Sequence, residues 1–438
     1  MTIIDHEKNK DLKTSYQAAL FRCLMIGFCQ DYVTPFLLLA GGTAFHVGLT
    51  SSLNSVTGSL FTLPSADIAR RVGSRKRVVI IFSVLQSAAL VALAILALNR
   101  QMQPVPVIVL AVFSGACQAL TQPCWFSLIS NLVDEDRRGV YFGWRARNIG
   151  LLTIGATFTA GCLLGFIEKY DAYAGFIILF ALAGISRFMS AVFVGRVNEP
   201  AIEYSKQHDF SFWAFLTSFR RSNFVRFVFF MAGMNFSIGL ASPYFAVFML
   251  ENLSFNYYYY TIINIIAPIV LYLVIPRWGR HADRTGNLKV LSFIAPLFAI
   301  NPILWSISQN FFVLLFAEII SGFLWAGFTL ASSNFIYDAV TPEKRTRCIA
   351  YCGVVNAVAL GLGTFLGGKI LPLLPEVNGH RMLCLFLISA ALRLISGVTL
   401  PRMVNEVRPV DKIRSHQLLF SMIGIKPIAG IERKSMQV

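Results

Sequence analysis

Stretches of about 20 mostly apolar residues recur along the whole chain, and that length is what an α-helix needs to cross the hydrocarbon core of a bilayer. Short polar segments separate the stretches, and glycine and proline are frequent within them, as in membrane helices. The pattern predicts an all-α membrane protein with twelve transmembrane helices. The predicted spans are 18–41, 47–67, 77–98, 104–131, 140–166, 172–196, 224–250, 257–276, 288–308, 311–337, 346–373 and 380–400.

The composition agrees with a chain covered by lipid. Of its 438 residues 56% are hydrophobic and 14% are charged, whereas a soluble domain has about a quarter of its residues charged. The net charge of +16 would suit a nucleic-acid surface, but Lys and Arg gather in alternate loops. Loops of that kind face the cytoplasm. We therefore expect no nucleic-acid partner, and an integral multi-pass protein of the plasma (bacterial inner) membrane with both termini cytoplasmic.

Sequence patterns for cofactors and for catalysis are absent. The eight cysteines all lie in apolar stretches, without a CxxC pair and without a histidine at metal-ligand spacing. There is no phosphate-binding loop, no H-E-x-x-H and no G-x-S-x-G motif. We expect no metal, no cofactor, no catalytic residue and no direct use of ATP, so the protein is not predicted to be an enzyme.

The chain contains an internal duplication. The segment VDEDRRGVYFGW (133–144) matches VTPEKRTRCIAY (340–351), and ISRFMSAVFVGRVNE (185–199) matches LRLISGVTLPRMVNE (392–406). Pro35 matches Pro243, and the offsets cluster between 206 and 213 residues, about half the chain. Fused repeats around a central site are typical of transporters that expose the site alternately to either side. Arg187 and Arg393 are matched as well, and we interpret both as architectural.

The duplication predicts two bundles with polar ends and a linker. These are a cytoplasmic N-terminal segment (1–17), an N-terminal six-helix bundle (18–197), a cytoplasmic linker with an interfacial helix (198–223), a C-terminal six-helix bundle (224–400) and a cytoplasmic C-terminal tail (401–438). The aromatic run Tyr257–Tyr260 begins the eighth span, and we interpret it as an anchor at the lipid headgroups.

The loop after the eighth span carries a family signature. It reads Gly279-Arg-His-Ala-Asp283-Arg284-Thr-Gly286-Asn-Leu-Lys289, which resembles the G-x-x-x-D-R-x-G-x-x-K/R loop of the major facilitator superfamily. The resemblance covers nearly the whole chain and implies two pseudo-symmetric six-helix bundles. In the first copy, aligned on Gly73, Arg70 replaces the aspartate, and Asp67 lies one turn earlier.

Two other patterns of the family are missing. Ala111 stands where the fourth span of many members has an arginine, and Glu318 holds the equivalent place in the tenth span. The fifth span lacks the Gly-Pro pair of drug–proton exchangers. The resemblance implies that the loop signatures lock the cytoplasmic side. The expected gate residues are Asp67, Arg71, Gly73, Asn131, Arg145, Gly279, Asp283, Arg284, Gly286 and Asp338.

Two carboxylates lie inside predicted spans, where burial of an ionisable group costs at least about 2.5 kcal/mol and marks a functional candidate. They are Asp31 in the first span and Glu318 in the tenth. Because these spans line the central cavity in the family, we expect both residues to face it, to bind a cationic group or to carry a coupling proton. A hydrogen-bonded structural carboxylate is the alternative for each. The full expected cavity set is Gln30, Asp31, Gln118, Gln122, Trp125, Asn235, Asn264, Glu318, Trp325 and Asn356.

Arg145 lies inside the fifth span and leaves two readings open. It can meet an anionic substrate at the inner mouth, or it can pair with Asp134, Glu135 or Asp136 or extend to the headgroups.

Together these features predict a secondary active transporter that moves a small solute by alternating access, coupled to protons or to another gradient. The expected partners are a small-molecule substrate, the lipid bilayer and coupling protons, and the expected state is a monomer. The alternative is a transport-inactive membrane receptor or assembly protein with the same fold, which the altered first loop and the missing arginine of the fourth span would suit.

Overall fold

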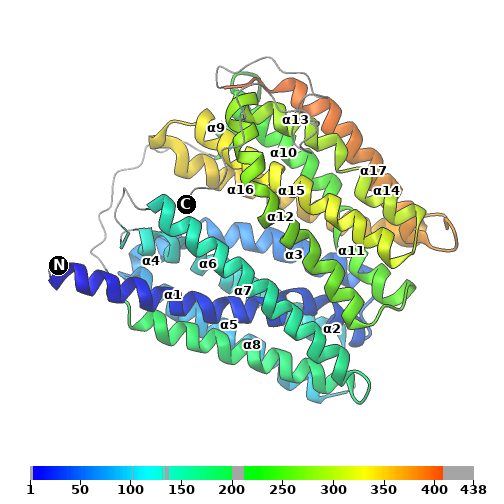
Figure 1. Ribbon diagram of the computed structural model, residues 1–438, viewed down its shortest axis with the longest axis horizontal. Helices are drawn as coiled ribbons and strands as arrows, with labels where there is room; N and C mark the ends of the chain where they lie inside the picture. The colour runs from blue at the N-terminus through cyan, green and yellow to red at the C-terminus, as the bar shows by residue number, and fades with distance from the viewer. Residues whose placement is uncertain (1–2, 101, 131, 134–137, 200–211, 408–438) are drawn as a thin grey trace. The chain divides into compact units, whose positions relative to one another are not determined.

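The computed structural model describes residues 3–100, 102–130, 132–133, 138–199 and 212–407, and these residues are almost entirely helical. Within them the only β contact is an isolated bridge between Val377 and His380. The first eight helices (Figure 1) are α1 Ile3–Cys29, α2 Val33–Leu39, α3 Ala44–Thr62, α4 Ser65–Val72, α5 Arg75–Leu98, α6 Pro104–Ser130, α7 Arg138–Ile167 and α8 Ala172–Gly195.

The remaining helices begin at residue 212, inside the predicted linker (198–223). They are α9 Phe212–Thr217, α10 Asn223–Gly239, α11 Ser242–Val247, α12 Tyr257–Thr285, α13 Asn287–Leu297, α14 Ile300–Ile307, α15 Phe311–Ala339, α16 Pro342–Ile370 and α17 Arg381–Thr399. The short helix α9 lies in the segment predicted as an interfacial helix, and its place on a membrane surface stays a prediction. The predicted tail, 401–438, is described only as far as 407.

Ten helical segments in the described part of the chain are long and apolar enough to cross a membrane. They correspond to the third through twelfth predicted spans. The first two predicted spans coincide with α1 and α2 and with α3 and α4. Helix α1 begins at Ile3 and carries the polar N-terminal residues, and α3 is rich in serine and threonine. Neither helix is among the ten segments.

The first and seventh spans, each predicted as one continuous helix, are broken at matching places. A 3₁₀ turn, Gln30–Tyr32, separates α1 from α2, and Pro35 follows in α2. Helix α10 ends at Gly239, and α11 begins at Ser242, one residue before Pro243. Proline has no N–H, so the carbonyl four residues earlier loses its helical partner. The duplication thus extends to the backbone geometry.

Tyrosine side chains hold the break in the first span. The carbonyl left free by Pro35 is that of Asp31, and the Tyr260 hydroxyl donates to it at 2.7 Å. The Tyr32 hydroxyl donates to the Thr157 carbonyl at 2.7 Å and lies 3.0 Å from the Thr261 hydroxyl. Tyr260 is 2% exposed, so the interpretation of the aromatic run as a headgroup anchor is wrong for this residue.

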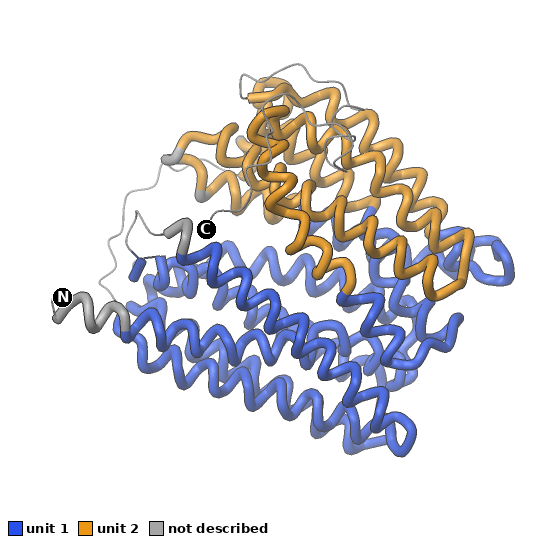
Figure 2. Tube along the Cα trace, viewed as in Figure 1, with its two compact units in different colours: residues 1–206, 238–265, 356–385 blue, residues 207–237, 266–355, 386–438 orange. Residues whose placement is uncertain are grey.

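The chain divides into two compact units, coloured separately in Figure 2. The first comprises residues 1–206, 238–265 and 356–385, and the second comprises residues 207–237, 266–355 and 386–438. The predicted boundaries at 18–197 and 224–400 follow the duplication instead of these units, and they stay a prediction.

Close helix contacts build the first unit. Helix α5 packs on α6 and α8, and α1 packs on α7 and α8, so these helices run side by side in Figure 1. Gly184 allows the approach of α8 to α5, because a Cβ there would lie 2.7 Å from a methyl group of Val91. The Ser87 hydroxyl donates to the Gly184 carbonyl at 2.7 Å across the same contact. Small residues commonly let membrane helices approach in this way.

In the second unit α13 and α14 pack on α15. Gly327 in α15 makes room for Trp278, whose ring would lie 2.7 Å from a Cβ at that position. The Trp278 indole N–H donates to the Phe323 carbonyl at 2.9 Å.

A duplicated glutamate closes the start of one helix in each unit. Gly73 (φ 71°) and Gly286 (φ 88°) precede α5 and α13 in a backbone conformation that favours glycine. The Glu199 carboxylate accepts from the Ser74 hydroxyl and from the Arg75 N–H at 2.7 Å. The Glu406 carboxylate accepts from the Leu288 N–H at 2.7 Å. A carboxylate satisfies N–H groups that have no partner in the first helical turn and complements the helix dipole.

We predict that Glu199→Gln lowers the melting temperature of the purified protein at neutral pH, by a loss of about 1 to 3 kcal/mol, the scale of hydrogen bonds to a charged group. Burial favours the neutral acid, but the hydrogen bonds from Ser74 and from the backbone N–H groups of Lys76 and Arg75 prevail. They hold the pKa of Glu199 below its ordinary value. A depressed native pKa stabilises the fold above the unfolded-state pKa, and this stabilisation is lost as the pH falls through the native pKa.

The difference between Glu199→Gln and the native protein should therefore narrow below about pH 4. Glu376→Gln is the matched control, because its exposed ion pair with Arg381 contributes little to stability. Equal losses for Glu199→Gln at neutral and acidic pH would contradict the role of the charge.

We also predict that Tyr260→Phe lowers the melting temperature, because the Asp31 carbonyl loses its donor inside the protein. The expected loss is about 1 to 3 kcal/mol, the cost of a buried acceptor without a partner. Tyr272→Phe, an exposed tyrosine on the same helix, is the control and should leave the melting temperature unchanged. Equal melting temperatures for the native protein and Tyr260→Phe would show that the break does not depend on this bond.

Candidate functional site

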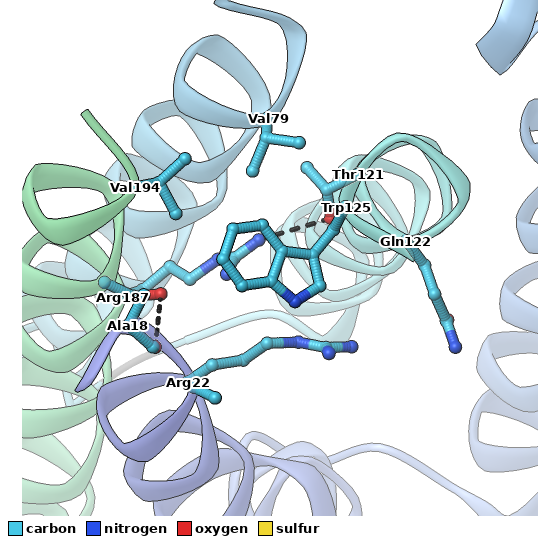
Figure 3. Close-up of a pocket in the computed structure, with 10 residues that line it drawn as sticks. Ala18, Arg22, Val79, Thr121, Gln122, Trp125, Arg187 and Val194 are labelled. Carbon is cyan, nitrogen blue, oxygen red and sulfur yellow. Dashed lines mark hydrogen bonds between the residues drawn. The ribbon is translucent and has the colours of Figure 1, made fainter. Parts of the chain in front are cut away.

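A pocket in the first unit is lined by four of its helices, α1, α5, α6 and α8, and is drawn in Figure 3. Its volume of about 20 Å³ has room for about one water molecule. The walls combine apolar side chains with two arginines and a few polar groups. The lining residues are Ala18, Ala19, Arg22, Val79, Thr121, Gln122, Trp125, Arg187, Ser190 and Val194.

The two arginines come from different helices and extend toward α6 in Figure 3. Arg187 of α8 is 2% exposed and donates to the Thr121 hydroxyl at 3.3 Å, while its buried Nε has no hydrogen-bond partner. Arg22 of α1 lies close enough to repel it electrostatically. Among the described residues neither arginine forms an ion pair. Two positive charges thus share a small pocket without a carboxylate.

Arg145 of α7 lies beside this pocket. It is buried and donates to the Ser15 hydroxyl at 3.1 Å and to the Tyr141 hydroxyl at 3.2 Å. Its guanidinium carbon lies 5.6 Å from the centre of the Trp125 ring, a cation–π contact. Arg145 therefore does not extend to the headgroups, and residues 134–136, its expected ion-pair partners, lie outside the described residues. Its part in a gate stays a prediction.

Asp31 and Glu318, for which the sequence predicts the same role, have different surroundings. The Glu318 carboxylate accepts from Asn301 Nδ2 at 2.9 Å and from Trp305 Nε1 at 3.2 Å, and Arg393 is within electrostatic range. The half-buried Asp31 carboxylate makes neither a hydrogen bond nor an ion pair with any residue that the structure describes. Glu318 thus has the contacts of a structural carboxylate, and Asp31 does not.

The other expected cavity residues are distributed over both units. Of the ten, only Gln122 and Trp125 line the pocket. Gln118 accepts from Gln86 Nε2 at 3.3 Å. Several others lie elsewhere: Asn235 and Asn264 donate to the Met231 and Tyr260 carbonyls of their own helices, Trp325 packs against Phe298, Gln30 is exposed, and Asn356 is half-buried in α16. Their role in a common cavity stays a prediction.

The expected gate residues include the two glycines that precede α5 and α13. Asp67 forms an exposed ion pair with Arg70 at 3.4 Å, and Asp338 accepts from Asn287 Nδ2 at 2.8 Å. The others are placed as follows: Arg71 is exposed at the end of α4, Gly279, Asp283 and Arg284 lie in the last turns of α12, and Asn131 lies outside the described residues. A gating role for this set stays a prediction.

The centre of the pocket was not predicted from the sequence. Arg22 is not among the expected site residues, although an arginine five residues into a predicted span is the same signal that marked Asp31. Arg187 is duplicated, and duplication favoured an architectural interpretation of it. The sequence could have paired the two only through knowledge that α1 and α8 are neighbours.

Comparison with known proteins agrees with this architecture. The profile of the Major Facilitator Superfamily matches residues 20–300 and 227–427. Probable multidrug resistance protein EmrY of Escherichia coli is 30% identical over 98 residues, 22% of this chain and 19% of that protein. Tetracycline resistance protein class H of Pasteurella multocida is 29% identical over 161 residues, 36% of this chain and 39% of that protein. The matches thus span less than two fifths of these curated relatives.

Solved structures share the fold over nearly the whole chain. The nucleoside transporter NupG superposes with a TM-score of 0.72 at 13% identity, covering 90% of this chain and 98% of that one. The POT family transporter PepTSo gives a TM-score of 0.70 at 10% identity, covering 90% and 97%. The predicted fold class is confirmed, and the protein is an integral, multi-pass membrane protein. With a family match from residue 20 to residue 427, this chain belongs to the major facilitator superfamily.

Proposed function

We propose that this protein is a secondary active transporter that moves a small solute across the membrane by alternating access. The observation that carries the proposal is the duplication with a broken first helix in each half. Discontinuous helices at equivalent places of two repeats are characteristic of transporters, in which they form the substrate and ion sites. Membership of a transporter family supports the same function. We also propose that the protein is a monomer in the plasma membrane with both termini in the cytoplasm.

We further propose that Asp31 carries the coupling proton. Its carboxylate is half-buried beside the break in the first span and has no partner among the described residues, whereas Glu318 is held by Asn301 and Trp305. A carboxylate without a fixed partner can gain and lose a proton with little rearrangement around it. Glu318 would first have to give up two hydrogen bonds.

The altered first loop supports one other candidate, a receptor or assembly protein that has the fold without transport. Arg70 replaces the aspartate of the family signature, and Asp67 forms an exposed ion pair with it. A transport-inactive protein would bind a ligand without moving it. Solute flux therefore separates the two candidates.

We predict that Asp31→Asn abolishes solute-driven proton movement and retains solute exchange. Asparagine keeps the size of the side chain but does not ionise near neutral pH. The measurement uses proteoliposomes loaded with a pH-sensitive dye and a panel of solutes first selected by thermal stabilisation of the purified protein. Exchange of radiolabelled solute without a gradient is followed in parallel.

Glu318→Gln is the comparison variant, and it should retain solute-driven proton movement while lowering the melting temperature. Proton movement of native rate in Asp31→Asn would exclude the coupling role of Asp31. Binding of a selected solute to the native protein without any flux would exclude transport and leave the receptor candidate.

A further inference from the structure

The pocket formed by α1, α5, α6 and α8 carries a positive charge to which the proposed function gives no role. Arg187 is 2% exposed, and its Nε has no hydrogen-bond partner. Arg22 faces the same space. Removing a charged group from water costs several kcal/mol unless an opposite charge and hydrogen bonds replace the water. Within the described residues nothing of opposite charge does so.

In the second half of the chain, an acidic residue and hydrogen-bond acceptors surround the charge of the corresponding arginine. Arg393, the counterpart of Arg187, has Glu318 within electrostatic range and donates to the Ser389 hydroxyl and to the Phe298 carbonyl. The counterpart of Glu318 in the first half is Ala111. The first half therefore lacks the carboxylate that compensates the charge in the second.

The first half also gains a charge. At the offset of 208 residues that relates Pro35 to Pro243, Arg22 corresponds to Phe230. Phe230 is buried in contact with Phe227 and Phe328, so the fold accepts an apolar side chain at this place. Loss of an acid and gain of a base together leave the pocket without an anion of its own.

The pocket offers donors for an anion. Among the described residues the guanidinium of Arg22 and the indole N–H of Trp125 have no hydrogen-bond acceptor, and the amide of Gln122 is exposed at the edge. Guanidinium groups bind carboxylates and phosphates through paired, charge-assisted hydrogen bonds. Val79, Val194 and the Trp125 ring supply apolar walls, which strengthen such bonds by excluding water.

We propose that Arg22 and Arg187 bind the oxyanion group, a carboxylate or a phosphate, of the transported solute. The inference rests on the proposed function only in calling the ligand a transported solute, because binding itself does not require transport. The pocket has room for about one water molecule, so we assign to it only an oxygen atom of the anionic group. The rest of the solute would lie beyond the exposed Gln122.

The test measures binding to the full chain purified in detergent, at constant ionic strength. The probes are inorganic phosphate, benzoate and citrate, with choline as a cation of comparable size. At least one of the oxyanions should raise the melting temperature and change the tryptophan fluorescence, because Trp125 lines the pocket, and choline should do neither.

Arg22→Phe is the decisive variant, because phenylalanine stands at the matching place of the second half, and a native melting temperature without ligand shows that it folds. It should lower the affinity for the oxyanion about ten- to a hundredfold, which is the equivalent of losing a hydrogen bond to a charged group. Arg22→Lys should recover part of the affinity, because it keeps the charge without the paired geometry. Arg196 is an exposed arginine directly after α8, stacked on Phe193, and Arg196→Gln should bind the oxyanion as the native protein does.

Oxyanion binding that Arg22→Phe leaves unchanged would overturn the proposal, as would stabilisation by choline alone. Stabilisation only by vesicle-derived anionic phospholipid, and not by soluble oxyanions, would also overturn it, because the ligand would then be a lipid headgroup. Transport of a neutral or cationic solute at native rate by Arg22→Phe would overturn this inference and leave the proposed function intact. Oxyanion binding that depends on Arg22 but occurs without any flux would support the site and exclude transport.

Discussion

Burial of a guanidinium group away from water is unfavourable unless an anion or a set of acceptors surrounds it, and each half of this chain buries one at the same place. Arg187 and Arg393 lie on matching helices, 2% and 4% exposed. In the second unit the surroundings complete the site, with Glu318, Ser389 and the Phe298 carbonyl near the charge. In the first unit Arg187 instead lines a pocket together with a second arginine, Arg22. The packing of each unit around its arginine thus determines which half is prepared for a ligand.

The two halves are more alike in features of the backbone than in the charges inside their helices. Both halves keep a break before a proline in the first helix, and both keep a glutamate at the start of the third span. These features set backbone geometry, which each bundle needs in order to fold. Charges inside the helices follow no such requirement. They differ at Arg22 and Phe230 and at Ala111 and Glu318, and this asymmetry suits one half for binding and the other for support.

The sequence was sufficient for features that depend on length and repetition. The length of the apolar stretches predicts the spans. The repeated segments predict the two halves and match Glu199 with Glu406. The sequence was insufficient where the outcome depends on neighbours in space. Depth in a span made Asp31 and Glu318 equivalent, and only the positions of Asn301 and Trp305 separated them. Arg22 becomes a candidate site residue only because Arg187, 165 residues away in sequence, lies in the same pocket.

Arg22 of α1 and Asp31 of the turn that follows α1 influence each other through their charges. Arg22 and Asp31 are nine residues apart, about 14 Å at helical rise, and belong to the same compact unit. A pocket with two arginines and no acid holds an excess of positive charge, which an oxyanion reduces. Protonation of a carboxylate at this distance reduces the negative charge that a bound anion would face. Binding of an anion and binding of a proton would then favour each other, as linkage requires of coupled sites. A protein that holds both would carry an anion and a proton together, with less charge moved across the membrane than by either alone.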